Sequence, residues 1–85
     1  MAITNQSRQY LEETLKQARI AEANMLETLA RGESLNIATV IAASNFTIGT
    51  SIGLKLIRDT FGEDELLTKL EAVIQRVEVL ISTNR

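Results

Sequence analysis

The side chains that could do chemistry in this 85-residue chain are nearly all carboxylates and single cations. Glu12, Glu13 and Glu22 are the best candidates for cation ligands, but their spacing puts them on different faces of a helix. The chain has no His and no Cys. These absences exclude a Ser-His-Asp triad, a thiolate nucleophile and a cysteine-based zinc site. We therefore expect no catalytic residues, no metal and no cofactor.

Phosphate-binding patterns are missing too. The four glycines are dispersed, and none is followed by Lys and then Ser or Thr, as in a phosphate-binding loop. Nine Lys and Arg residues are outnumbered by eleven Asp and Glu, and only Lys55 and Arg58 approach a basic cluster. Because nucleic-acid binding normally needs a basic stripe, a small nucleic-acid-binding regulator is only a second alternative.

The composition is typical of one small domain covering residues 1–85, with 45% hydrophobic residues and a formal net charge of −2. No apolar run follows a basic start in the first eight residues, so no secretory signal is expected there. Together with the absence of Cys, this predicts a cytoplasmic location.

Two amphipathic helices are predicted, at about residues 7–31 and 63–83. In the first, Thr4 or Ser7 can cap the start, Arg31-Gly32 is typical of an end, and Glu22 fills a position in the apolar row. The apolar rows are Leu11, Leu15, Ala18, Met25 and Leu29 in the first helix, and Leu66, Leu70, Val73, Val77 and Leu80 in the second. Before the second, Thr60 to Glu63 matches a capping box, although Gly62 could equally end the preceding helix.

The segment between them, about residues 34–60, carries no charge between Glu33 and Lys55. Residues 46–56 alternate apolar with small or polar side chains, which is compatible with a strand, and Ser44-Asn45 could turn a hairpin. Large apolar residues also recur at helical spacing, and the alanines and glycines are poor strand formers. We favour a helix, and hence an all-α fold: a three-helix antiparallel bundle, or a helical hairpin plus a third helix.

An uncharged helix of about 21 residues, roughly 30 Å long, is normally surrounded by other protein segments. We predict that its small residues form the free face, near Asn36, Val40, Ala43, Thr47, Thr50 and Leu54. The glycines would let another helix approach closely, either in a second chain or within one monomer. The predicted interaction residues are Ala42, Phe46, Gly49, Gly53 and Ile57.

The predicted function is non-enzymatic: a structural, scaffold or adaptor protein that forms a homo-oligomer or binds a partner helix, with coiled-coil-like packing. Small domains bury little surface alone, which favours assembly. Asn24 and Asn45 lie near the apolar rows, where a buried pair would set register; the alternative is that both are solvated. A membrane-active or holin-like element, inserting through residues 34–57, is the alternative function.

Overall fold

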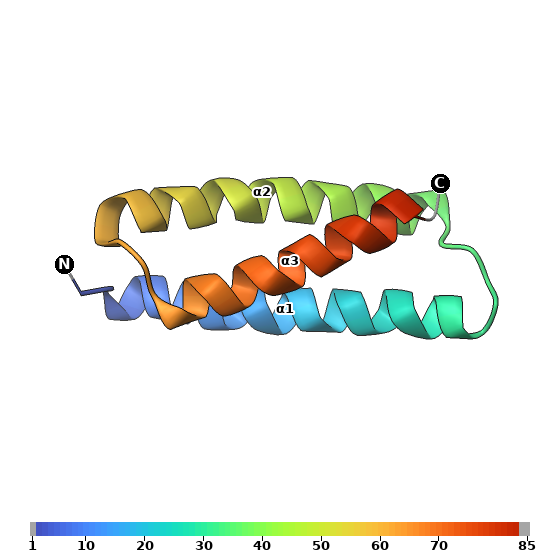
Figure 1. Cartoon of the computed structure of the whole chain (residues 1–85), viewed down its shortest axis with the longest axis horizontal. Coiled ribbons are helices and arrows are strands. Elements are labelled where there is room, and N and C mark those ends of the chain that lie inside the picture. The colour runs from blue at the N-terminus through green and yellow to red at the C-terminus, as the bar shows by residue number, and fades with distance from the viewer. Residues whose placement is uncertain (1, 84–85) are drawn as a thin grey trace.

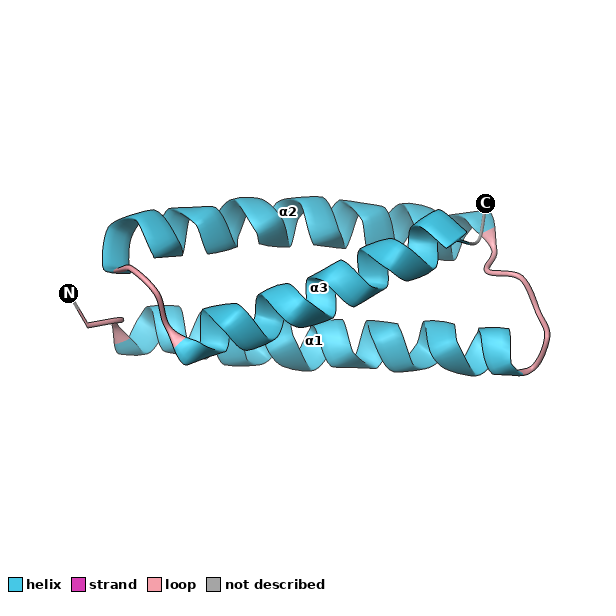
Figure 2. Cartoon of the chain, in the orientation of Figure 1, coloured by secondary structure: helices cyan, strands magenta, loops and turns pink. Residues whose placement is uncertain are grey.

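The computed structural model describes residues 2–83 and contains α1 (Asn5–Ala30), α2 (Ile37–Phe61) and α3 (Glu65–Thr83). The described residues include no strand (Figure 2), so the helical interpretation of the middle segment is confirmed and the hairpin is wrong. Successive helices run in opposite directions, and α3 crosses diagonally over α1 and α2 (Figure 1). The molecule is elongated, with extents of 46 × 17 × 16 Å.

The helix ends follow local hydrogen bonding. Of the two candidate caps for α1, Thr4 is the one used: its Oγ1 accepts from the Ser7 amide at 3.1 Å. The Asn36 side chain caps α2 by accepting from the Thr39 amide at 2.8 Å. Gly62 ends α2 with a φ of 86°, a left-handed conformation that favours glycine. The capping box at Thr60 is therefore not formed.

The core lies between α3 and the other two helices. α3 packs against both of them, whereas α1 and α2 contact each other at few positions. The buried apolar side chains of α3 are Leu67, Leu70, Val73, Ile74, Val77 and Ile81, and those of α1 are Leu11, Leu15, Ala18 and Met25. Each fully buried aliphatic side chain contributes about 1.5–3 kcal/mol. The faces predicted for α1 and α3 are thus the buried ones, with Leu29, Leu66 and Leu80 half-buried at their edges.

Two groups of ion pairs connect α3 to its neighbours. Arg76 Nε lies 2.7 Å from a carboxylate oxygen of Glu22, which explains an acid in the apolar row of α1. Nearer the start of α3, Arg58 of α2 contacts Glu71 at 3.0 Å, and it also contacts Glu63, just before α3, at 2.7 Å. These pairs link α3 and the turn before it to both neighbouring helices at the edge of the core.

Candidate interaction surface

The most apolar helix contributes least to the core. α2 buries only Ala43 and Leu54 as apolar side chains, together with Thr47 and Thr50. Five of its large aliphatic side chains instead point to solvent, each between 54% and 77% exposed. They form a row along one face of the helix, which we call the isoleucine stripe: Ile37, Ile41, Ile48, Ile52 and Leu56. The stripe extends for about 28 Å along the helix.

The small-residue face predicted to be free is the buried one, so that prediction is wrong. Ala43, Thr47, Thr50 and Leu54 pack inward, and Val40 is half-buried. Short side chains on α2 suit the bulky aliphatic residues of α3 that fill the space between the helices. The Thr47 hydroxyl donates to the Ser44 carbonyl at 3.0 Å, so it can be buried while hydrogen-bonded.

The five predicted interaction residues lie beside the stripe, on the side of α2 nearer to α1. Ala42 and Phe46 line an open groove of about 530 Å³ between α1 and α2, which is also bordered by Ile20, Ala21 and Asn24. Phe46 and Ile57 are half-buried and pack against the core. These residues therefore lie on one side of the helix, where some pack against the core and others face solvent.

The two glycines of this row have different surroundings. A Cβ on Gly49 would meet nothing within 4 Å. A Cβ on Gly53 would come within 2.6 Å of the phenolic oxygen of Tyr10 in α1. Gly53 therefore allows close packing inside the protomer, while Gly49 leaves open space next to the stripe.

A second hollow lies on the other side of the stripe. It has a volume of about 450 Å³ between α2 and α3, and Ile48 and Ile52 form part of its wall. Small hydroxyl side chains, Ser44 and Ser51, lie beside them, and Glu78 and Ser82 come from α3. The stripe is thus a ridge with a hollow on one side and an open groove on the other.

Within α2, charge is confined to the last two turns. At one end the stripe finishes beside Lys55 and Asp59, both exposed. Arg58, in contrast, is neutralised by Glu63 and Glu71, and hydrogen bonding to Glu71 is the main cause that raises its pKa. Lys55 and Arg58 therefore do not combine into a basic patch.

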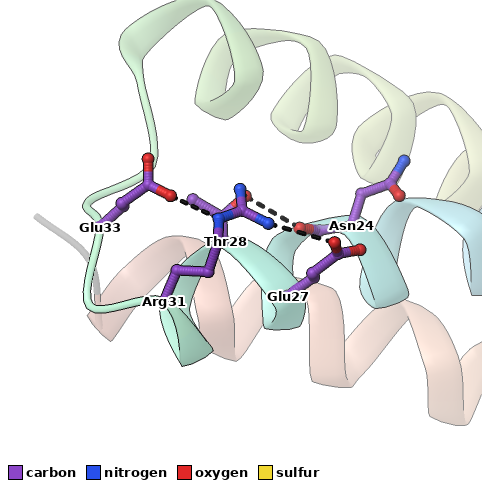
Figure 3. Close-up of polar contacts among 5 residues, drawn as sticks. All are labelled: Asn24, Glu27, Thr28, Arg31 and Glu33. Carbon is purple, nitrogen blue, oxygen red and sulfur yellow. Dashed lines mark hydrogen bonds and ion pairs between the residues drawn. The ribbon is translucent and has the colours of Figure 1, made fainter.

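The turn before the other end of α2 is held by one arginine. Arg31 pairs with Glu27 at 3.1 Å and also with Glu33, as Figure 3 shows. The Thr28 hydroxyl donates to the Asn24 carbonyl at 3.0 Å in the same region. Asn24 and Asn45 are both exposed, so the protomer does not bury them as a pair. Asn45 lies within the stripe, between Ile41 and Ile48 in sequence.

Two further observations concern what the surface can bind. Among residues 2–83, no three His, Cys, Asp or Glu side chains come together in a group able to hold a metal ion. Within that same part of the chain, α2 alone is long and apolar enough to cross a membrane by length and composition, and 22% of its most apolar window is buried. A buried core helix can pass the same test, but α2 is mostly unburied.

No protein-family model, no curated protein sequence and no solved structure matches the chain.

Proposed function

We propose that this chain is a non-catalytic assembly protein that binds another protein helix, in the first instance by self-association, through the isoleucine stripe of α2. The observation that carries the proposal is the outward orientation of five large aliphatic side chains on a helix with no charge from residue 34 to 54. Contiguous exposed apolar patches of this kind mark interaction surfaces.

The surface area of the protomer supports the proposal. The chain of 9.4 kDa exposes 5561 Å², whereas a folded monomer of that mass exposes about 5,000 Å². A typical stable interface buries roughly 800 Å² per partner. The elongated protomer therefore exposes more surface than is typical for its mass, and the stripe is part of that surface.

The test is the native mass of the purified protein, measured by light scattering at high micromolar concentration. We expect a multiple of 9.4 kDa for the wild-type chain. Ile48→Lys and Ile52→Lys should reduce this mass to that of the monomer while circular dichroism still shows helix. Val79→Lys is the matched control, because Val79 is 59% exposed but lies on α3, outside the stripe. A wild-type protein that remains monomeric would refute the proposal.

Membrane association is a second candidate, favoured by the length, composition and low burial of α2. Against it, Asn45 interrupts the stripe, and Lys55 and Asp59 lie at its end. Release of a trapped dye from lipid vesicles by the wild-type protein, lost in Ile48→Lys, would favour this candidate. A water-soluble oligomer that leaves vesicles intact would favour assembly.

A further inference from the structure

The residues of the stripe have the same sequence spacing whether α2 is followed from its N-terminus or from its C-terminus. Their positions, with Asn45 included, are separated by four, four, three, four and four residues, which is symmetric about a point between residues 46 and 47. If a second α2 lies antiparallel about that point, Ile37 is level with Leu56 of the second copy. Ile41 is then level with Ile52, and Asn45 is level with Ile48. Each aliphatic side chain at either end of the stripe thus meets another aliphatic side chain.

The hollows beside the stripe are suited to such an antiparallel pairing. Side chains at a helix seam pack as large residues into hollows on the facing helix. The hollow of about 450 Å³ beside Ile48 and Ile52 is one such space, and the open side of Gly49 is another. In the antiparallel arrangement, Gly49 is level with Ser44 of the second copy. Ser44 and Gly49 therefore lie within one helical turn of the symmetry point, where two crossing helices come closest.

The charges of Lys55 and Asp59, at the end of the stripe, favour an antiparallel over a parallel pair of α2 helices. In the described part of the chain, neither Lys55 nor Asp59 forms an ion pair. A parallel pair would put Lys55 next to Lys55 of the second copy and Asp59 next to its counterpart, which is unfavourable for like charges. An antiparallel pair separates the two copies of Lys55 by about 25 Å along the helix.

We propose that a second copy of this chain covers the isoleucine stripe, as an antiparallel α2–α2 pair about a two-fold axis between residues 46 and 47. This inference rests on the proposed function and specifies its partner and geometry. A self-complementary patch of this kind is what a two-fold interface requires, because the same surface is used on both subunits.

Cysteine cross-linking tests the geometry, since the natural chain has no Cys to interfere. Two single variants, Ile41→Cys and Ile52→Cys, are made at exposed positions and checked for helix by circular dichroism. A disulfide needs Cα atoms within about 7 Å. In the antiparallel pair, two copies of residue 41 are about 16 Å apart along the axis, so neither variant alone cross-links. An equimolar mixture should give a disulfide-linked mixed dimer on oxidation. Ala23→Cys, at an exposed position on α1, measures random collision.

The outcomes separate this inference from the proposed function. A mixed dimer, with little cross-linking of either variant alone or of Ala23→Cys, supports the antiparallel pair. Cross-linking of each variant with itself would show a parallel pair and overturn the inference. An oligomeric mass without cross-links would place assembly on another surface, overturning the inference while leaving self-association intact. A monomeric wild-type protein, or one found only in vesicles, would overturn both.

Discussion

Tyr10 lies so close to Gly53 that a Cβ on the glycine would come within 2.6 Å of the phenolic oxygen. This relationship brings the first turns of α1 against the last turns of α2, two helices that otherwise contact each other at few positions. It also gives Gly53 a role within the protomer, which a pattern of small residues alone could not distinguish from a role between chains. Gly49, one turn earlier, has no such neighbour.

The first prediction compares alanine at these two glycines. Gly49→Ala should raise the free energy of unfolding by about 1 kcal/mol, because alanine favours a helix and the new methyl group meets open space. Gly53→Ala should gain less, because Tyr10 must move away. The measurement is urea unfolding in dilute protein, below the concentration at which assembly occurs.

Tyr10→Phe is the control for that comparison. It removes the phenolic oxygen and leaves ring carbon Cζ at 3.4 Å, an ordinary contact distance for a Cβ. In the Tyr10→Phe background, Gly53→Ala should recover the gain seen at Gly49. If Gly53→Ala is equally favourable in both backgrounds, Tyr10 does not limit the space above Gly53.

Sequence reasoning could predict α1 and α3 because their apolar rows contrast with charged residues on the other faces. Residues such as Leu11 and Leu70 are buried as expected. For α2 the same reasoning identifies the helix but not its orientation, since every face is uncharged up to Lys55. The general preference for burying isoleucine does not decide the matter here. α3 already supplies bulky side chains, so Ala43 and Thr47 fit against it better than Ile48 would.

The surroundings of the five predicted interaction residues also depend on tertiary structure. Ala42 and Gly49 do face solvent, but Gly53 and Ile57 pack within the protomer. The contact between Tyr10 and Gly53 depends on how two helices cross, and no spacing within one helix contains that information. The isoleucine stripe was visible as a helical row, yet only the tertiary structure shows that it points outward.

The second prediction concerns the ion pairs of Arg58, which join the end of α2 to Glu63 and Glu71. Arg58→Gln should lower the urea midpoint, and added salt should reduce the difference from wild type. The pKa of Arg58 is raised, chiefly by its hydrogen bond to Glu71. A group whose pKa is higher in the folded than in the unfolded state makes its full contribution to stability at pH values below its unfolded pKa. This contribution is lost only as the pH rises through the folded pKa, which lies in the strongly alkaline range.

The effect of Arg58→Gln should therefore be equal at neutral and moderately alkaline pH, because the guanidinium keeps its proton throughout. Lys55→Gln is the matched control: it removes one cation from the same helix without breaking an ion pair described for this chain. Equal midpoints for the two variants would contradict a stabilising role for the pairs.

The third prediction separates a core residue from a stripe residue. Leu70→Ala should cost about 2–5 kcal/mol of unfolding free energy, because Leu70 is fully buried and its truncation leaves a cavity. Ile48→Ala should change the stability of the dilute protomer by no more than about 0.5 kcal/mol, because Ile48 is 61% exposed.

Protein concentration distinguishes the two variants further. Assembly stabilises the folded state by mass action, so the wild-type urea midpoint should rise with concentration. Leu70→Ala should keep this rise, displaced to lower urea, whereas Ile48→Ala should flatten it. If Ile48→Ala is as destabilising in dilute protein as Leu70→Ala, the stripe is not an external surface.

The last prediction concerns Asn45, the one polar residue among the aliphatic side chains of the stripe. In the antiparallel pair its amide is level with Ile48 of the second copy and is buried on assembly. Burying an amide without a full set of hydrogen bonds costs about 1–3 kcal/mol. Asn45→Leu should therefore tighten self-association by roughly tenfold or more, measured by sedimentation velocity over a dilution series. Asn24→Leu is the matched control, because Asn24 is also exposed but lies on α1.

The same substitution also tests what sets the direction of the pairing. A parallel pair would put Asn45 next to Asn45 of the second copy, where the two amides could hydrogen-bond, whereas the antiparallel pair puts it next to Ile48. Asn45→Leu removes this advantage of the parallel pair, so in its background Ile41→Cys alone should still give little cross-linked dimer on oxidation. Tighter association with cross-linking still confined to the mixed pair would mean that the aliphatic spacing and the charges of Lys55 and Asp59 set the register without Asn45. Unchanged affinity would mean that assembly leaves Asn45 in water and that the two-fold axis lies elsewhere.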